Sequence, residues 1–314
     1  MSRIIKAAAA QMGPVQRSQD KTEVVATIDC LLNDAADKGC DLVVLPELAL
    51  TTFFPRWLVE DEAELDAYYE TAMPGDVTRP LFETARRRQV SFYLGYAELI
   101  VEAGRKRRFN TSIIVDRNGD VIAKYRKIHL PGHAEPDPRR QFHQFEKRYF
   151  EVGDLGFPVW DHLDGRFGMC LCNDRRWPET FRVMGLQGVE MVLLGYNTPT
   201  KNSIRYENEE LRRFHNRLCM QAAAYQNSTF VIGAAKAGVE DGHGLIGGSA
   251  IVHPDGRVIA EAKTDGDELV IAECDLDDCV FNRETIFNFS AHRRTEHYAL
   301  ITDHGATPTK ETMT

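Results

Sequence analysis

The chain has 314 residues, a formal net charge of −9, and 43% hydrophobic and 27% charged residues. These values are typical of a globular protein with one large core or two modest domains. The negative charge disfavours contact with phosphate backbones, so nucleic acid is not an expected partner. No apolar run approaches the roughly 20 residues that span a bilayer, so no membrane contact is expected either.

The first half of the chain alternates between strand and helix patterns. Residues 3–11 predict a strand, and residues 20–38 predict a helix because their apolar side chains recur on one face. Residues 41–45 form a short apolar run, typical of a strand buried on both faces. The pattern then predicts helices over 60–72 and 77–88 and strands over 90–99, 109–116 and 121–126, with a hairpin turn at 117–120 where Asn-Gly accepts positive φ.

The second half continues this alternation after a polar, proline-containing stretch over about 131–156, which is long enough to be a functional loop. The predicted strands are 166–172, 191–194, 229–236 and 267–275, the helices are 178–187 and 207–226, and a hairpin joins 246–253 to 257–262. Clustered Gly244, Gly247 and Gly248 precede no helix pattern, which indicates a close backbone approach and not a phosphate loop.

This order of elements predicts an α/β layered fold in a single domain over residues 1–314. The tail over about 281–314 has a mixed pattern, and we expect it to pack on a neighbouring subunit. Seven cysteines, an odd number, and no recognisable export signal favour a reducing cytoplasm over a disulfide framework. Cys170 and Cys172 form a C-x-C pair without further ligand spacing, so no metal is expected.

Three reactive side chains follow predicted strands. Glu47 follows 41–45, Lys127 follows 121–126, and Cys172 ends 166–172. Sites in α/β sheets gather outside the carboxyl ends of strands, so these three are expected to converge. A thiol that attacks an amide-like carbonyl needs a base, and a carboxylate with a raised pKa can serve. The resulting oxyanion needs a fixed donor, for which Lys127 and the backbone N–H of Asn173 are candidates.

Each residue of this trio also has a structural interpretation. Glu47 is compatible with a solvated strand end, and Lys127 with a solvated basic cluster over 124–127. Cys172 is compatible with a small core hydrophobe. Its position where a strand turns toward a helix favours reactivity, because N–H groups, the helix dipole and two nearby arginines would lower the pKa of the thiol.

Several dense motifs support the functional interpretation. They are LPELALTTFFPRW (45–57), GYAEL (95–99), FNTSIIVD (109–116), KYRKIHLPGH (124–133), RYFEVGDLGFPVW (148–160) and CNDRRWPE (172–179). These motifs resemble the nitrilase superfamily, whose catalytic residues are Glu, Lys and Cys in this order. Within it, LTTFFPRW, KIHLPGH, EKRYFE, CNDRRWPE and GYNTPT are most similar to N-carbamoyl-D-amino-acid amidohydrolases, the D-carbamoylases.

The resemblance implies a four-layer αββα sandwich that assembles into homodimers or homotetramers and uses no metal or organic cofactor. It makes Glu47 the general base, Lys127 the oxyanion stabiliser and Cys172 the nucleophile. Glu146 matches an additional glutamate beside the trio. An ion pair between Glu146 and its neighbours 147–148 is the alternative.

Two histidines are candidates for supporting roles. His129 matches the family and is expected to fix the loop after Lys127. Gln144 stands where the family tends to have a histidine, and His143 precedes it, which leaves a supporting role for His143 open.

Substrate contacts are expected from residues that follow two strands. Arg175 and Arg176 follow the nucleophile, and guanidinium groups bind a carboxylate through two parallel hydrogen bonds. A surface-charge role is the alternative for both. Asn197 and Thr198 follow another strand and are expected to bind the ureido or carboxylate group. Residues 200–210 depart from the family pattern and are expected to line the side-chain pocket.

The predicted reaction is hydrolysis of an N-carbamoyl-D-amino acid to a D-amino acid, ammonia and carbon dioxide. The D configuration follows from the resemblance alone. A β-ureidopropionase-like or aliphatic amidase activity is the first alternative, although a buried arginine that faces a neutral ligand would be left unpaired. A catalytically silent binding or assembly protein is the second.

Overall fold

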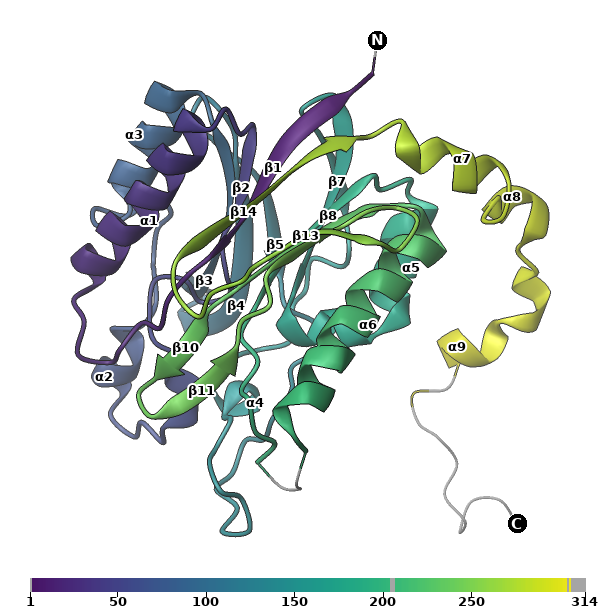
Figure 1. The fold of residues 1–314 in the computed structure, drawn as a ribbon. Helices are drawn as coiled ribbons and strands as arrows, with labels where there is room; N and C mark the ends of the chain where they lie inside the picture. The colour runs from purple at the N-terminus through teal and green to yellow at the C-terminus, as the bar shows by residue number, and fades with distance from the viewer. Residues whose placement is uncertain (1, 204–206, 304, 306–314) are drawn as a thin grey trace, which may run out of the picture.

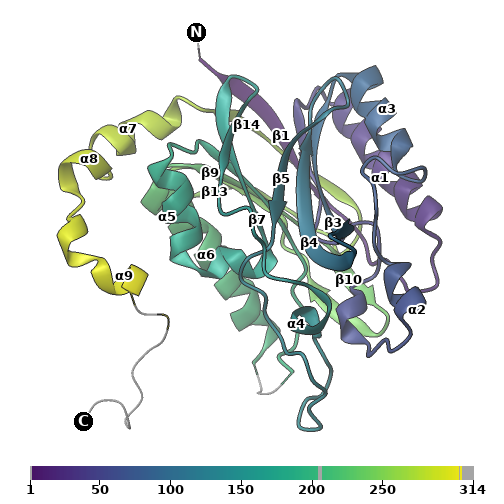
Figure 2. The ribbon, with the colours of Figure 1, turned by 180° about the vertical axis from the view of Figure 1, so that it is seen from behind.

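The computed structural model describes residues 2–203, 207–303 and 305. Two six-stranded sheets lie face to face between two pairs of helices, which gives the layer order αββα (Figures 1 and 2). The first sheet has the order β14-β1-β2-β3-β4-β5. Its strands are β1 (Ile4–Gln11), β2 (Leu42–Val44), β3 (Ser91–Glu102), β4 (Arg105–Val115), β5 (Val121–Arg126) and β14 (Glu268–Asp275). Strands β1, β2 and β3 are parallel, and the other neighbours are antiparallel.

The second sheet repeats this design, with the order β13-β12-β9-β8-β7-β6. Its strands are β6 (Val159–His162), β7 (Gly165–Leu171), β8 (Met191–Tyr196), β9 (Phe230–Ala235), β12 (Ala250–Val252) and β13 (Val258–Glu261). Strands β7, β8 and β9 are parallel. A separate hairpin of β10 (Ala237–Glu240) and β11 (His243–Ile246) lies beside the sandwich.

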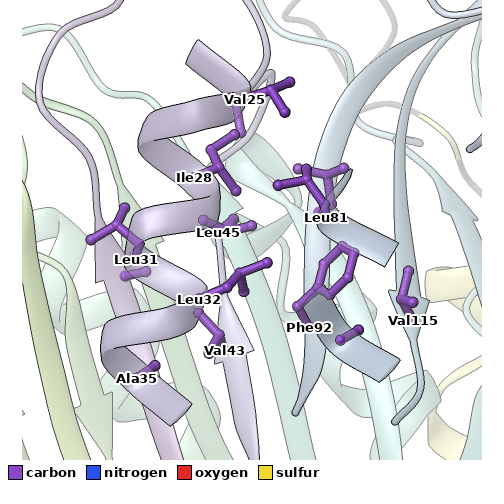
Figure 3. Close-up of a cluster of buried hydrophobic side chains, with 14 of the residues drawn as sticks. Val25, Ile28, Leu31, Leu32, Ala35, Val43, Leu45, Leu81, Phe92 and Val115 are labelled. Atoms are coloured by element: carbon purple, nitrogen blue, oxygen red, sulfur yellow. The ribbon is translucent and has the colours of Figure 1, made fainter. Parts of the chain in front are cut away.

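Helices cover the outer face of each sheet, as their amphipathic patterns require. Helices α1 (Lys21–Asp37) and α3 (Arg79–Arg88) cover the first sheet, and Figure 3 shows Ile28 and Leu32 of α1 above Val43 of β2. Helices α5 (Pro178–Leu186) and α6 (Glu209–Asn227) cover the second. The side chain of Asp20 caps α1 by accepting a hydrogen bond from the Thr22 N–H at 2.8 Å.

The core between the sheets explains why their strands read as apolar on both faces. Ala7, Val44 and Tyr93 of the first sheet pack in one buried cluster with Met169 and Leu193 of the second. Burial on both faces is what the continuous apolar runs predicted. The expected four-layer αββα fold is therefore confirmed.

The helix predicted over 60–72 was too long. Helix α2 (Glu62–Asp66) is the only helical part, because the chain then leaves the helix to pair with β3. Glu70 forms an isolated bridge with Glu98, and the ring of Tyr68 stacks on Phe54 at 4.6 Å. Tertiary contacts therefore override the local helical pattern.

Other strand boundaries differ from the prediction where charged residues or glycine interrupt the apolar pattern of a strand. Strands β3 and β4 extend through a charged hairpin tip to residues 102 and 105. The β10–β11 hairpin was missed, although its turn at Asp241-Gly242 has positive φ at both residues, a typical hairpin signal. The close approach expected at the clustered glycines is present: a Cβ at Gly244 would lie 2.7 Å from Oγ1 of Thr200.

The C-terminal tail contains α7 (Asp278–Glu284), α8 (Phe289–His292), the 3₁₀ turn η3 (Thr295–His297) and α9 (Ala299–Asp303). Its first part contacts its own chain. Arg283 donates hydrogen bonds to the carbonyls of Val189 and Ser228, and Phe287 meets Tyr225 edge-on at 4.9 Å. Contact of the tail with a neighbouring subunit stays a prediction, and residues 304 and 306–314 lie outside the described part. Within the described ranges no helix is both long and apolar enough to cross a membrane.

Candidate active site

Four predicted site residues meet at the carboxyl ends of the strands. Glu47 follows β2, Lys127 follows β5, Cys172 follows β7, and Glu146 begins the short helix α4 (Glu146–Tyr149). Their side chains are fully or almost fully buried. The Nζ of Lys127 lies 2.6 Å from Oε1 of Glu47 and 2.5 Å from Oε2 of Glu146. The alternative of an ion pair between Glu146 and its sequence neighbours is therefore replaced by a pair with Lys127.

The carboxylate of Glu47 is held from three directions. Besides Lys127, the side-chain N–H of Asn110 donates to Oε1 at 2.8 Å and the backbone N–H of Asn197 donates to Oε2 at 3.2 Å. The side chain of Asn197 also donates to the backbone carbonyl of Glu47 at 2.7 Å. Asn197 therefore fixes Glu47, and its expected contact with substrate stays a prediction.

Two glycines bring the backbone of Glu47 into the contact between the sheets. A Cβ on Gly95 of β3 would lie 2.6 Å from the carbonyl oxygen of Pro46, and a Cβ on Gly195 of β8 would lie 2.7 Å from the nitrogen of Glu47. Real Cβ atoms do not approach backbone this closely, so any side chain at either position would push this segment away. One glycine from each sheet is thus required for the observed position of Glu47.

The charges at this centre shift one another's protonation. Burial lowers the pKa of Lys127, but Cys172 in its thiolate form, Glu146 and Glu47 outweigh burial and raise it, so the ammonium stays protonated. Burial raises the pKa of Glu146 to about 7, against the opposing effect of Lys127. Within the described part of the chain, two carboxylates engage the three-donor ammonium, which leaves one N–H for an oxyanion.

The nucleophile candidate sits on a strained turn. Cys172 has φ +45° at the junction between β7 and the 3₁₀ turn η2 (Cys172–Arg176), and its Sγ lies 3.6 Å from the carbonyl oxygen of Asn197. A left-handed φ is uncommon for a residue with a Cβ and directs the side chain sharply out of the strand. Such a turn is typical of a nucleophile presented at the edge of a sheet.

The expected lowering of the Cys172 pKa was wrong. Burial raises the pKa of the thiol, and Glu47 raises it further, whereas Lys127 and Arg175 lower it without cancelling these effects. The physical reason is that Cys172 begins a buried five-residue 3₁₀ turn, while the α-helix starts only at Pro178. The resting residue is therefore a thiol that needs a base.

A buried carboxylate that the sequence analysis missed organises the turn. Asp174 accepts hydrogen bonds from the Tyr125 hydroxyl at 2.7 Å and the Leu171 N–H at 3.1 Å. Its other oxygen lies 2.8 Å from the backbone nitrogen and 2.9 Å from Nδ1 of His129. The ring of His129 also stacks on Trp177 at 4.7 Å, so His129 lies where it can fix the loop after Lys127. The available signal was an Asp two residues after the candidate nucleophile.

The two arginines that follow the candidate nucleophile differ in burial and in their hydrogen-bond partners. Arg175 is buried, donates to the carbonyl of Cys172 at 2.6 Å and to Oγ1 of Thr198 at 2.8 Å, and lies over the ring of Tyr196. Arg176 is exposed and donates to Oδ1 of Asn173 at 2.9 Å. They do not form one side-by-side pair, although both start from the nucleophile turn. The Nδ2 of Asn173 donates to the carbonyl of His129 at 3.0 Å.

A third arginine, which the sequence analysis missed, approaches from α6. Arg212 donates to Glu207 at 2.8 Å and to the carbonyl of Pro199 at 2.5 Å. Pro199 directly follows Thr198, the partner of Arg175, so Arg212 and Arg175 hold consecutive residues. Burial lowers the pKa of Arg212, Glu207 raises it, and the positive charge of Arg175 lowers it. Of the expected side-chain pocket over 200–210, residues 204–206 lie outside the described part.

His143 contacts Phe145, the residue that precedes the buried Glu146. Its Nδ1 is 3.1 Å from Nε2 of His133, and its ring stacks on Phe145 at 4.7 Å. Phe145 immediately precedes Glu146, so this contact supports the α4 start. Gln144, the other candidate position, accepts a hydrogen bond from the His133 N–H through its backbone carbonyl at 3.0 Å.

A buried cysteine, a lysine and two glutamates gather at one end of an αββα sandwich, and their chemistry is compatible with hydrolysis of an amide. The family pattern of the carbon-nitrogen hydrolases matches residues 6–283, and the chain belongs to this family.

Relatives of the chain cover nearly its full length. A nitrilase of Pyrococcus abyssi is 30% identical over 87% of this chain and 90% of its own length. An N-carbamoylputrescine amidase of Arabidopsis thaliana is 28% identical over 92% and 93%, and a citrullinase of Francisella tularensis is 26% identical over 82% and 86%. A crystal structure of a carbon-nitrogen hydrolase from Helicobacter pylori superposes with a TM-score of 0.80 at 25% identity, over 96% and 98% of the two chains.

Proposed function

We propose that the protein hydrolyses N-carbamoyl-D-amino acids to D-amino acids, ammonia and carbon dioxide. Two relatives bear the names N-carbamoylputrescine amidase and citrullinase, and their named substrates carry a terminal carbamoyl or ureido group, which supports this group as the reacting end. The D configuration is supported by the motif resemblance of 50–57 and 172–179 to D-carbamoylases.

The observation that carries the proposal is the positive charge around the nucleophile. Arg175, Arg176 and Arg212 surround the Cys172 turn and the Thr198–Pro199 segment, and the charges of Arg175 and Arg212 affect one another. Adjacent guanidinium groups repel, and an anionic ligand would offset that cost. A carboxylate on the substrate is therefore favoured over the ammonium of a carbamoylputrescine-like molecule.

The reaction begins with the thiol of Cys172. Glu47 accepts its proton while the sulfur attacks the carbamoyl carbon, which turns the carbonyl oxygen into an oxyanion. The remaining N–H of the Lys127 ammonium and the backbone N–H of Asn173 stabilise that oxyanion. The tetrahedral intermediate then collapses, one nitrogen leaves with the proton that Glu47 carried, and an S-acyl cysteine remains.

Water completes the reaction. Glu47, again a carboxylate, removes a proton from a water molecule that attacks the S-acyl carbon. The carbon–sulfur bond breaks and the thiol recovers its proton. Loss of the second nitrogen from the released acid gives, in total, one amine, one ammonia and one carbon dioxide for each water consumed.

Ammonia release from a panel of substrates tests the proposal. The panel contains matched N-carbamoyl-D- and N-carbamoyl-L-amino acids, a β-ureido acid, N-carbamoylputrescine and a simple aliphatic amide. We expect release from the D series, with kcat/KM at least about tenfold above the L series. Preferred hydrolysis of N-carbamoylputrescine would contradict the carboxylate assignment, and turnover of the simple amide alone would favour an aliphatic amidase.

The same panel tests whether Arg176 binds the carboxylate of the substrate. Arg176→Ala is expected to raise KM for the N-carbamoyl amino acid about tenfold and to leave the simple amide nearly unchanged. Arg182→Ala is the matched control, because Arg182 lies on α5 over the ring of Phe289 in the tail. Equal losses on acidic and neutral substrates would remove the carboxylate argument.

We also propose that the chain forms a homodimer or homotetramer through α5 and α6. The outer face of α6 exposes Leu211, Phe214 and Leu218, although its inner face is buried, and Figure 1 shows none of the other described elements over it. Large apolar side chains that gather on an exposed helix face often mark a contact with another protein surface. We expect a dimer or tetramer by sedimentation, and Phe214→Glu with Leu218→Glu should dissociate it. Val239→Glu on β10 is the control, and a wild-type monomer would overturn the proposal.

A further inference from the structure

A second buried charge cluster lies behind Glu47, outside the centre described above. Lys236, between β9 and β10, and Glu240, at the end of β10, are fully buried, and Arg56 is nearly so. The Nζ of Lys236 lies 2.7 Å from Oε2 of Glu240, and Nη1 of Arg56 lies 3.2 Å from Oε1 of Glu240. Burying three charged groups is costly unless each is paired and hydrogen-bonded, as these are.

The carboxylate of Glu240 gathers the loop that follows Glu47. Besides the two cations, it accepts hydrogen bonds from the backbone N–H groups of Val15 at 3.1 Å and Phe53 at 2.9 Å. Phe53 belongs to the segment 48–56, so Glu240 ties this segment to the β10 hairpin. Its many donors keep Glu240 well satisfied as a carboxylate.

Lys236 joins this cluster to the two segments that hold Glu47. Its Nζ donates to the carbonyl of Thr51, four residues after Glu47, at 2.7 Å. Its backbone N–H donates to Oδ1 of Asn197 at 3.2 Å. Asn197 in turn donates through Nδ2 to the carbonyl and through its backbone N–H to the carboxylate of Glu47. Lys236 thus fixes both the loop after Glu47 and Asn197, which in turn holds Glu47.

We propose that Lys236, held by Glu240, is a positioning residue that keeps Glu47 aligned as the base. The role is indirect, since Lys236 contacts neither Cys172 nor Lys127 among the hydrogen bonds of the described chain. Burial lowers the pKa of Lys236, and Glu240 and, more weakly, Glu47 oppose this effect without cancelling it. The inference rests on the proposed use of Glu47 as a base, but not on the identity of the substrate.

A double-mutant cycle tests this role. Lys236→Met is expected to lower kcat about tenfold or more with KM within about twofold, because misplacing a catalytic group affects the transition state more than substrate binding. In a Glu47→Gln background the same substitution should change the residual rate by less than about twofold. The cycle uses whichever member of the substrate panel is hydrolysed, so failure of the carbamoyl assignment leaves it intact.

A stability measurement and a control variant separate positioning from folding. Lys236→Met leaves Glu240 paired with Arg56 at 3.2 Å, so the carboxylate keeps a buried cation, and kcat is compared per folded molecule after thermal unfolding of each variant. Glu190→Gln is the matched control: Glu190 pairs with Arg3 at 2.9 Å just before β8, at the end opposite Asn197, and should keep the wild-type rate per folded molecule. Equal losses from Lys236→Met in both backgrounds, or an unchanged kcat, would overturn the proposal.

Discussion

Cys172→Ala is expected to lower hydrolysis by about 10,000-fold or more, because the sulfur forms the covalent bond on which both halves of the reaction depend. The measurement is ammonia release at saturating substrate, together with the mass of the protein during turnover. Wild-type protein should show a mass increase that matches an S-acyl adduct, and the variant should show none.

Cys170→Ala is the control for this loss. Cys170 lies on β7 two residues before Cys172 and is also buried, in the same apolar cluster under α5 and α6. The control should lose some thermal stability and keep its turnover per folded molecule. Near-native hydrolysis by Cys172→Ala would show that another group is the nucleophile.

Glu47→Gln is expected to lower kcat by about 1,000-fold, within the range for removal of a general base. Glu146→Gln is its matched comparison, because both carboxylates contact the same Lys127 ammonium and both lie in full burial. If the two substitutions acted only by disturbing Lys127, their losses would be similar. A much larger loss at Glu47 would identify it as the base, and a smaller loss there would assign that role to Glu146.

Substitution of Glu146 is also expected to change how the reactivity of Cys172 depends on pH. The pKa of Glu146, about 7, lies above its ordinary value of 4.5, so Glu146 gains its charge as pH rises through neutrality. That charge raises the pKa of Cys172 and so opposes thiolate formation. Alkylation of Cys172 by iodoacetamide above pH 7 should therefore be faster in Glu146→Gln than in the wild type, and the inflection near pH 7 should be lost.

The strand ends were predictable because a single local pattern marks each of them. A strand pattern followed by Glu47, Lys127 or Cys172 places each residue at a strand end. Glu47 and Cys172 follow parallel strands, and Lys127 follows β5, which is antiparallel to β4 and therefore runs in the direction of β3. The partners that tune the site were not predictable in the same way. Lys236 bonds to Thr51 across 185 residues, and no local pattern records that contact.

The wrong prediction for the Cys172 thiol has a similar origin. Sequence indicates a strand, a turn and a helix, but it does not indicate how deeply the turn is buried or that a 3₁₀ segment separates Cys172 from α5. Burial decides the direction of the pKa shift, and burial is a property of the assembled layers. Asp174 escaped notice for the same reason, because its partners Tyr125 and His129 come from another strand and loop.

Because of the glycines beside Glu47, the position of the proposed base depends on the distance between the two sheets. Gly95 and Gly195 come from opposite sheets, and the Pro46–Glu47 peptide lies between them with no room to spare. A larger side chain in the core between the sheets, for example at Met169 or Leu193, would separate the layers and move the base without touching any site residue. Substitutions that enlarge this core would therefore lower turnover even where they add packing contacts. Substitutions meant to stabilise the protein should be placed on the outer helices, where they leave the distance between the sheets unchanged.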